Sequence, residues 1–400
     1  MTAATVRVDE SAQWLVRRLG ARVRGGTVVV NDGDSPMVFG SGDPFAEVTV
    51  HDARAYRSLL RGSHGLTEAY IKGWWSSADL TSLFRVLARN VRGPMAGLDR
   101  IGALAAPIAD PVARLRRSSK ATDRHNVRAH YDISNDFYSL MLDGTMTYSC
   151  ALFERPGMSL EEAQLAKLER LCSMLDLSAR DHLVEIGTGW GGLALHAATG
   201  HGCQVTTTTI SAAQHDHATK RVAEAGLADR ITVLESDYRD LTGSYDSLVS
   251  VEMIEAVSWR DHQTFFDSCA RLVRPGGRAA LQAIVIDDSS FDRAKRHDDF
   301  IRRTIFPGGC LPSLASIRRN ARRAGLQLIE LHDIGNHYPP TLRAWRANVH
   351  ANADHVRALG FDDEFLRLWD LYLTYCEAGF LERHITDVQL VFERTASSEW

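Results

Sequence analysis

The sequence lacks the marks of several classes of protein. It contains no run of about 18 apolar residues, the length that a membrane-spanning helix needs, and its first residues do not form the apolar core of a secretory signal. Its 6 cysteines include no CxxC pair, so we expect neither a zinc knuckle nor a disulfide framework and predict no metal site. A net charge of −4 leaves no global basic field for nucleic acid. These absences favour a cytoplasmic protein that does not bind nucleic acid.

What the sequence does contain is a glycine-rich turn between an apolar strand and a helix. Residues 183–186 are apolar except for Glu185 and are typical of a short buried strand, and a helical pattern starts at Gly192. The glycines between them, among them Gly187 and Gly189, permit positive φ and let a ligand approach the backbone. This order is that of the first unit of a nucleotide-binding α/β sheet, although a glycine pattern alone also fits a turn without a ligand.

The next predicted strand argues against a dinucleotide. Such a site needs an acidic residue about 20 residues beyond the glycines to bind the ribose, but the strand at 203–210 ends in hydroxyl side chains and no carboxylate follows before Asp216. The acids stand elsewhere, at Glu185 inside the first strand and at Asp237 after a third strand at 231–235. This arrangement suits a ligand without phosphate and resembles the S-adenosylmethionine-dependent methyltransferases.

The chain divides into segments that differ in their predicted secondary structure. Residues 1–100 combine short strands and helices and predict a small α+β domain, whereas residues 101–124 are typical of a linker and end in basic side chains. Residues 125–400 predict the catalytic domain, an α/β, Rossmann-like class I methyltransferase fold with a seven-stranded mixed sheet. A charged helical insertion at about 287–320 fits either a solvated helix face or a lid over an acyl channel.

Short segments in order along the chain carry a further signal. They are 62–75, 125–138, 146–154, 187–191, 209–214, 236–238, 250–257, 306–312, 336–338 and 387–390. In these segments the chain resembles the cyclopropane-fatty-acyl-phospholipid synthase family, which includes the mycolic acid cyclopropane synthases. The resemblance implies an enzyme that transfers a methylene group from S-adenosyl-L-methionine to the double bond of unsaturated phospholipid acyl chains, giving cyclopropane fatty acids.

The implied reaction makes definite demands on the site. An alkene is a poor nucleophile, so the sulfonium donor must be held close and in line. Methyl transfer leaves a carbocation, which needs a dry site with aromatic or negative groups. A base must then remove a proton from the new methyl group so that the ring closes. The resemblance implies that this base is a bound bicarbonate ion.

The resemblance assigns residues to both parts of the site. The implied catalytic residues, as ligands of bicarbonate, are Cys150, Glu255, Gln282, Ile284 through its backbone, and Tyr338. The implied residues at the S-adenosylmethionine site are Tyr148, Ser149, Gly187, Gly189, Thr209, Gln214, Asp237 and Tyr238, with Glu185 acting indirectly or through water. Gln282 stands where the best-known members carry histidine; an amide can donate a hydrogen bond to an anion but cannot take up a proton.

Some of these residues also have a structural interpretation. A free cysteine is usually a buried small apolar residue, which is an alternative for Cys150. Glu255 could be an exposed helix acid that shares a face with Glu252. Tyr338 could pack at the turn that precedes Pro339.

Two other functions stay open. The same cation could lose a proton after a hydride shift and give a methylene-branched (10-methylene type) chain, the precursor of a methyl-branched fatty acid. Alternatively, the chain could be a lipid-binding protein without catalysis. A phospholipid chain cannot diffuse freely, so we expect peripheral contact with the inner face of the membrane through basic residues at 114–124 and the lid. A homodimer is a further expectation.

Overall fold

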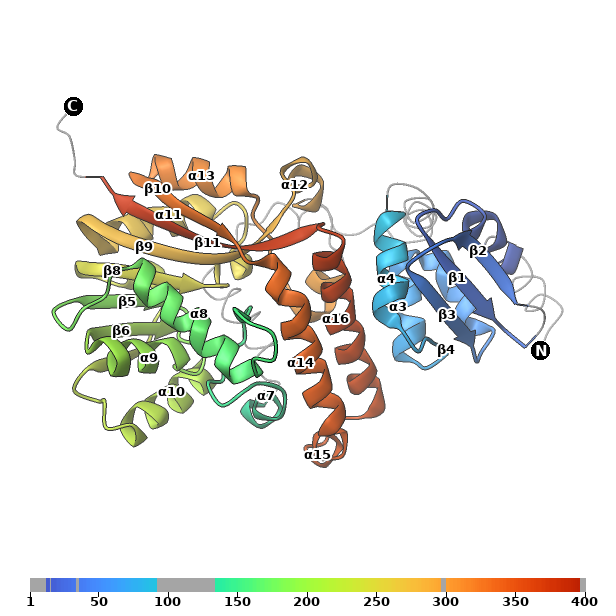
Figure 1. Cartoon of the computed structure of the whole chain (residues 1–400), viewed down its shortest axis with the longest axis horizontal. Helices are drawn as coiled ribbons and strands as arrows, with labels where there is room; N and C mark the ends of the chain where they lie inside the picture. The colour runs from blue at the N-terminus through green and yellow to red at the C-terminus, as the bar shows by residue number, and fades with distance from the viewer. Residues whose placement is uncertain (1–11, 15, 34–35, 92–133, 296–299, 396–400) are drawn as a thin grey trace. The chain divides into compact units, whose positions relative to one another are not determined.

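The computed structural model describes residues 12–14, 16–33, 36–91, 134–295 and 300–395. Within these ranges the chain forms two compact units (Figure 1). One combines the segments before residue 92 with Val349–His384, and the other combines the segments from 134 to Asn348 with those from Ile385 onward. The predicted limits at 100 and 125 lie outside the described residues. Residues 349–384, expected within the catalytic domain, group with the first unit.

The first unit is built on a small sheet with strand order β2-β1-β3-β4. Its strands are β1 (Gly26–Asn31), β2 (Met37–Ser41), β3 (Phe45–Val50) and β4 (Trp75–Ser76). Its helices include α2 (Arg54–Ser58), α3 (Ser63–Ile71), α4 (Leu80–Arg89), α15 (Ala353–Ala358) and α16 (Asp363–Leu381). α4 begins behind Asp79, whose carboxylate accepts a hydrogen bond from the Ser82 N–H at 2.9 Å and so caps the helix.

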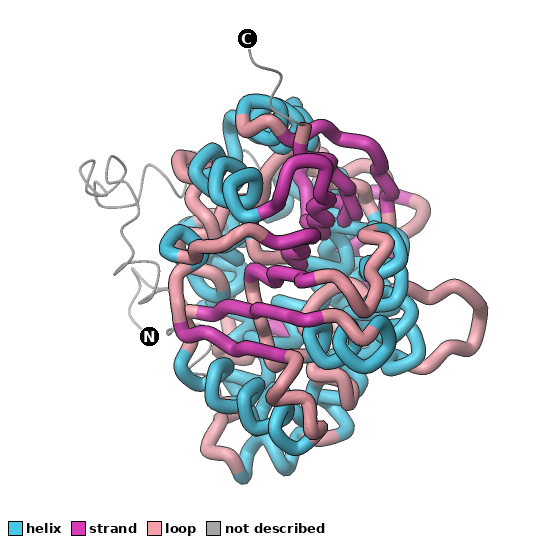
Figure 2. Tube along the Cα trace, turned by 90° about the vertical axis from the view of Figure 1, so that its left-hand side faces the viewer, coloured by secondary structure: helices cyan, strands magenta, loops and turns pink. Residues whose placement is uncertain are grey.

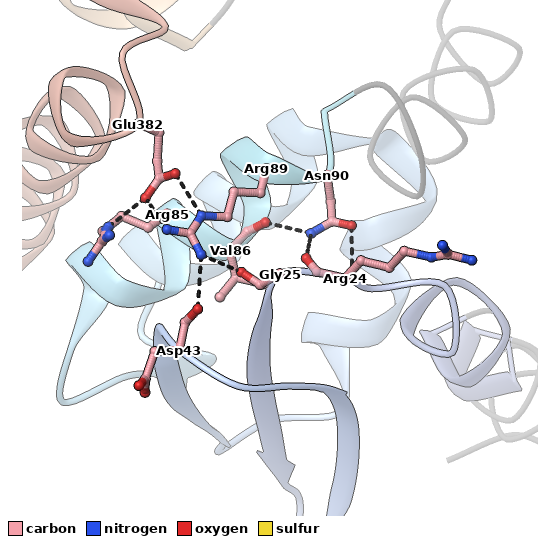
Figure 3. A network of polar contacts seen from close by, with 8 residues as sticks. All are labelled: Arg24, Gly25, Asp43, Arg85, Val86, Arg89, Asn90 and Glu382. Atoms are coloured by element: carbon pink, nitrogen blue, oxygen red, sulfur yellow. Dashed lines mark hydrogen bonds and ion pairs between the residues drawn. The ribbon is translucent and has the colours of Figure 1, made fainter.

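Two arginines of α4 hold Glu382, the residue that follows α16 (Figure 3). Arg85 Nε and Arg89 Nε each lie 2.7 Å from a different oxygen of the Glu382 carboxylate. Arg89 also donates to the carbonyl oxygens of Gly25 and Asp43, at 2.7 and 2.9 Å. The network therefore links the end of α16 to α4 and to the loops beside β1 and β3, which explains why this late segment belongs to the first unit.

The second unit contains a seven-stranded sheet with the order β10-β11-β9-β8-β5-β6-β7. Its strands are β5 (His182–Ile186), β6 (Gln204–Thr209), β7 (Ile231–Glu235), β8 (Tyr245–Val251), β9 (Val273–Ile286), β10 (Leu326–Asp333) and β11 (Ile385–Arg394). β11 runs antiparallel to both of its neighbours, whereas the pairs from β9 to β7 are parallel. The predicted seven-stranded mixed sheet is confirmed.

Helices cover both faces of this sheet, as the magenta strands between cyan helices in Figure 2 show. The described helices of this unit include α7 (Asn135–Met141), α8 (Leu160–Met174), α9 (Gly192–His201), α10 (Ala212–Glu224), α11 (His262–Leu272), α12 (Asp288–Ala294), α13 (Leu314–Arg323) and most of α14 (Tyr338–Ala351). Successive residues of a strand point to opposite faces. Leu183 therefore packs with residues of α8 and α9, whereas Val184 packs with residues of α11 and α13.

The predicted lid insertion contains two different kinds of segment. α13 packs on the sheet through Ile317 and Ala321, which belong to the core, so it is not part of a lid. The two predicted alternatives, a solvated helix face and a lid, then apply to α12 and to the π-helical turn Ile301–Ile305. None of the described helices combines the length and the hydropathy that a bilayer crossing requires.

Candidate active site

A cavity of about 200 Å³ lies in the second unit, at the carboxyl ends of the parallel strands. In open α/β sheets this edge is where ligands bind. Every residue that the resemblance implies for S-adenosylmethionine lines it, namely Tyr148, Ser149, Glu185, Gly187, Gly189, Thr209, Gln214, Asp237 and Tyr238. The fold thus gathers these residues around one cavity; their role in binding stays a prediction.

The glycine turn after β5 forms one wall of this cavity. Gly187, Gly189 and Gly191 have φ of 103°, 52° and 85°, a region that side chains with a Cβ disfavour. The N–H groups of Gly187 and Thr188 both donate to the carbonyl of Thr208, at 3.0 Å, and fix the turn against β6. A Cβ at Gly189 would meet nothing within 4 Å, so the backbone there is open to a ligand.

Two buried ionisable residues, Glu185 and Lys167, line the cavity. Burial raises the pKa of Glu185 to about 8, although the Thr207 hydroxyl donates to this carboxyl at 2.6 Å. Burial also lowers the pKa of Lys167 to about 8, and its Nζ donates to the Ser149 hydroxyl at 2.7 Å. Sequence reasoning missed Lys167. In the sequence, Lys167 lies one turn after Ala163, on the face of α8 that is buried.

Two other predicted acceptors of the cavity lining are already engaged with neighbouring side chains. Both oxygens of Asp237 accept from Arg239, at 2.8 and 2.6 Å. The Gln214 side-chain oxygen accepts from the Thr209 hydroxyl at 2.9 Å. A carboxylate oxygen can accept more than one hydrogen bond, so Asp237 keeps acceptor capacity toward a ligand.

The implied catalytic residues converge on a carboxylate that sequence reasoning had noted only as a neighbour of Glu255. Glu252 Oε1 accepts from the Cys150 N–H at 2.8 Å and from Gln282 Nε2 at 2.9 Å. Glu252 Oε2 accepts from the Tyr338 hydroxyl at 2.6 Å. Three segments distant in sequence therefore direct neutral donors at one side chain, which also lines the cavity.

Gln282 is fixed in orientation by its partners. Its side-chain oxygen accepts from Gln389 Nε2 at 3.0 Å, which turns its Nε2 toward Glu252 and toward Asp387 Oδ2, at 3.0 Å. Asp387 is fully buried; burial, and then the charges of Glu252 and Glu255, raise its pKa well above its usual range. Asp387 therefore holds its proton more firmly than an ordinary carboxyl.

Glu255 pairs with the backbone of β9 and does not bond to the Glu252 group. Its Oε1 accepts from the Ile284 N–H at 2.5 Å, and its Oε2 is covered without a hydrogen-bond partner. The residue as a whole is half-buried, but its carboxyl lies in the interior. Burial, and then the charge of Glu252, raise the pKa of Glu255 to about 8. The alternative of an exposed helix acid is therefore wrong.

Cys150 contributes its backbone and not its thiol. Burial raises the pKa of the thiol well above its usual range, and Sγ lies 3.4 Å from the Ala151 carbonyl oxygen and 3.8 Å from that of Ile334. Reactive cysteines are exposed thiolates, so this thiol is no nucleophile. The side chain packs as a small apolar residue, as the structural interpretation held.

The donors that the resemblance assigns to bicarbonate are thus engaged by carboxylates of the chain itself. Glu252 accepts from Cys150, Gln282 and Tyr338, and Glu255 accepts from Ile284. An added anion at these donors would also face the negative charge of Glu252. The residues in this arrangement do not fit a bicarbonate ion.

A cluster of potential metal ligands lies away from the cavity. The ligand atoms of Cys172, His196 and His201 lie within 4.8 Å of one another, and none of these residues lines the cavity. Both histidines already pair with Glu169, at 3.0 and 3.3 Å. These contacts join α8 to α9, and we assign no metal to them.

Comparisons with known proteins agree with this geometry. A family model described as mycolic acid cyclopropane synthetase matches residues 118–390. The tuberculostearic acid methyltransferase UfaA1 of Mycobacterium tuberculosis (strain ATCC 25618 / H37Rv) is 38% identical over 369 residues, which are 88% of this chain and 84% of that protein. The cyclopropane-fatty-acyl-phospholipid synthase of Escherichia coli (strain K12) is 34% identical over 360 residues, 88% of this chain and 89% of that one.

A solved structure gives the same result for the fold. The crystal structure of the mycolic acid cyclopropane synthase CmaA1 complexed with SAH and CTAB superposes with a TM-score of 0.64 and 31% sequence identity. It covers 68% of this chain and 98% of that chain. The predicted class I methyltransferase fold is confirmed.

Proposed function

The chain belongs to the mycolic acid cyclopropane synthetase family, and from this membership we propose that it transfers a one-carbon group to the double bond of an unsaturated phospholipid acyl chain. It is an S-adenosylmethionine-dependent methyltransferase, as its family is. The observation that carries the proposal is one cavity that combines the predicted donor-site residues with the half-buried carboxylate of Glu252. A small-molecule methyltransferase would not need the additional first unit.

S-adenosylmethionine supplies an electrophilic methyl group on a positively charged sulfur. The glycine turn, Tyr148 and Asp237 would position it in the cavity. The aromatic rings near this cavity suit a cationic acyl chain: the Tyr138 ring lies 4.8 Å from that of Trp190 and 5.3 Å from that of Tyr148. Aromatic faces attract cations and exclude water, which would otherwise capture a carbocation.

The product is either a cyclopropane or a methylene branch. One relative is named a tuberculostearic acid methyltransferase and another a cyclopropane-fatty-acyl-phospholipid synthase, at comparable identity. In both reactions the new methyl group loses a proton, so both need a base at the same place. The two products have equal mass and differ in whether an alkene remains.

We also propose peripheral contact with the inner face of the membrane, because the acyl chain stays in its phospholipid. The first unit exposes Trp14, Val38 and Phe45, at 57%, 63% and 53% of their surface, and the Arg18 guanidinium lies 5.0 Å from the Trp14 ring. Aromatic and basic side chains favour the lipid interface. The basic residues at 114–124 lie outside the described residues.

The proposal is tested by expression in a bacterium rich in monounsaturated phospholipid that lacks its own cyclopropane synthase. Methyl-labelled donor should place label in phospholipid fatty acids, and NMR should show either cyclopropane or exocyclic methylene protons. The Asp237→Asn variant should lose labelling, whereas Asp240→Asn, an exposed acid in the same turn, should not. Purified protein that binds the donor but labels no lipid would support the non-catalytic alternative. Light scattering on the same preparation reports whether it is a homodimer.

A further inference from the structure

Glu252 stands where the proposed reaction needs a base. Its carboxylate accepts hydrogen bonds from the Cys150 N–H, the Gln282 amide and the Tyr338 hydroxyl, all between 2.6 and 2.9 Å. These are the groups that the family resemblance assigns to an external anion. The Glu252 side chain therefore occupies the place that the resemblance predicts for bicarbonate.

Position separates Glu252 from the other members of this group. Of the described residues Cys150, Glu252, Glu255, Gln282, Tyr338 and Asp387, only Glu252 lines the cavity of the donor site. It follows directly after β8, at the edge of the sheet where the cavity opens. Glu255 and Asp387 do not line the cavity, so Glu252 is the carboxylate of this group that a proton released in the cavity can reach directly.

The backbone of Glu252 adopts a conformation that favours glycine. Its φ is 47°, in the left-handed region that costs energy for any residue with a Cβ. Its N–H donates to the Gln282 carbonyl at 2.8 Å and holds this conformation. Such strain at a cavity wall is typical of residues retained for function, since a glycine would satisfy the same backbone without cost.

We propose that the Glu252 carboxylate is the general base of the reaction and replaces bicarbonate in this chain; the inference rests on the proposed function. The methyl carbon forms a bond to one alkene carbon as its bond to sulfur breaks, and the sulfur keeps the electron pair of that bond. A C–H bond of the new methyl group then breaks. Its electron pair closes the ring onto the adjacent cationic carbon, and the proton goes to a Glu252 oxygen. If a hydride shift comes first, the same pair forms the exocyclic double bond.

The neighbouring carboxyls support this assignment. Burial, and then the charge of Glu252, raise the pKa of Asp387 and Glu255 above their usual ranges. Each of these two carboxyls therefore releases its proton less readily than an ordinary carboxyl, and the carboxylate of the group that lines the cavity is Glu252. Its hydrogen-bond donors are neutral, and none of them removes its charge by ion pairing.

The test uses the full-length enzyme with methyl-labelled S-adenosylmethionine and vesicles of dioleoylphosphatidylglycerol, in buffers freed of carbon dioxide or supplemented with bicarbonate. The wild-type rate should be the same in both buffers. Glu252→Gln should lower turnover by about 100-fold or more while the affinity for the donor, measured by calorimetry, is unchanged. Glu224→Gln, an exposed acid on α10, is the matched control.

The Glu252→Gly variant provides a second measurement that does not depend on the first. Glycine adopts the observed backbone conformation without strain, and removal of the side chain frees the three donors. This variant should bind ¹³C-bicarbonate, detected by line broadening, and should recover part of its turnover with bicarbonate or formate. The wild-type enzyme should not bind bicarbonate.

The outcomes separate the inference from the proposed function. A wild-type enzyme whose lipid labelling stops when bicarbonate is removed, or a Glu252→Gln variant with nearly full turnover, overturns the role of Glu252 and leaves the proposed function intact. A wild-type enzyme that labels no lipid in either buffer overturns the proposed function itself.

Discussion

Each unit of the molecule contains a glutamate held by several donors, and the two differ in the charge of those donors. In the first unit, Glu382 is held by the guanidinium groups of Arg85 and Arg89 (Figure 3). In the second, Glu252 is held by a backbone N–H, an amide and a phenol. The two arginines compensate the negative charge of Glu382. The neutral donors orient the Glu252 carboxylate without adding a positive charge beside it.

This difference separates a structural carboxylate from one suited to chemistry. Arginine partners compensate the charge of a carboxylate and lower its tendency to take up a proton. Neutral donors fix its geometry at a smaller cost in basicity. A glutamate with neutral donors, at a cavity wall, can therefore act as a base, and a glutamate between two arginines holds elements together.

The largest expected effect comes from exchanging each glutamate for glutamine. Glu252→Gln should lower turnover by about 100-fold or more, because an amide cannot accept the proton. Glu382→Gln should leave turnover per folded molecule unchanged, because its partners lie within the first unit. Steady-state rates, corrected for the folded fraction by circular dichroism, check both. Equal losses of turnover in the two variants would contradict the distinction between a structural carboxylate and one suited to chemistry.

A smaller effect is expected when one neutral donor is removed. Tyr338→Phe deletes the hydroxyl that lies 2.6 Å from Glu252 Oε2, and a hydrogen bond to a charged group contributes about 2 kcal/mol, equivalent to about 10-fold or more in rate. The loss should fall on kcat and leave the donor affinity unchanged. Tyr245→Phe is the control, since that hydroxyl donates to the Thr242 carbonyl outside the cavity. A pure loss of donor affinity would contradict the assignment.

The residues that the sequence analysis assigns to the donor lie around one cavity, and the reason is local. Gly187, Gly189, Thr209 and Asp237 lie at or just after the ends of successive parallel strands, and the alternation of strands and helices places such ends at one edge of the sheet. Their convergence follows from the fold class, which periodicity and the resemblance both indicate.

The proposed base, Glu252, was missed because its place in the site depends on contacts between distant segments. Cys150, Gln282, Tyr338 and Asp387 meet at Glu252 only after β8, β9 and β11 pair and α14 packs nearby. A resemblance transfers roles position by position, and it assigned a role to Glu255 but none to Glu252. Similarly, the pattern of residues 363–377 predicts a helix but not its partner, α4 of the first unit.

The pH dependence of stability extends the comparison to Glu255, a carboxyl without a cationic partner. Its pKa is raised from 4.5 to about 8 in the folded state, so between these values the folded protein holds a proton that the unfolded chain releases. The free energy of unfolding should therefore fall as pH rises from about 4.5 to about 8, by about 1 kcal/mol per pH unit for this group. Below this range the contribution is complete.

Glu255→Gln should reduce that slope, because glutamine does not titrate. Urea denaturation at several pH values measures it, with Glu224→Gln as the control that keeps the wild-type slope. Glu185, whose pKa is also raised to about 8, contributes in the same direction and maintains a residual slope. An unchanged slope in the Glu255→Gln variant would show that this carboxyl is ionised in the folded protein.

The smallest effect is expected for stability when Glu382 loses its charge. The side chains of Arg85 and Arg89 are 30% and 31% exposed, and that of Glu382 is 11% exposed, so water screens part of the attraction. Glu382→Gln should therefore lower the free energy of unfolding by only about 1 kcal/mol. The loss should shrink at high salt, because the removed interaction is ionic. A salt-independent loss would instead indicate that packing of Glu382, and not its charge, joins α16 to α4.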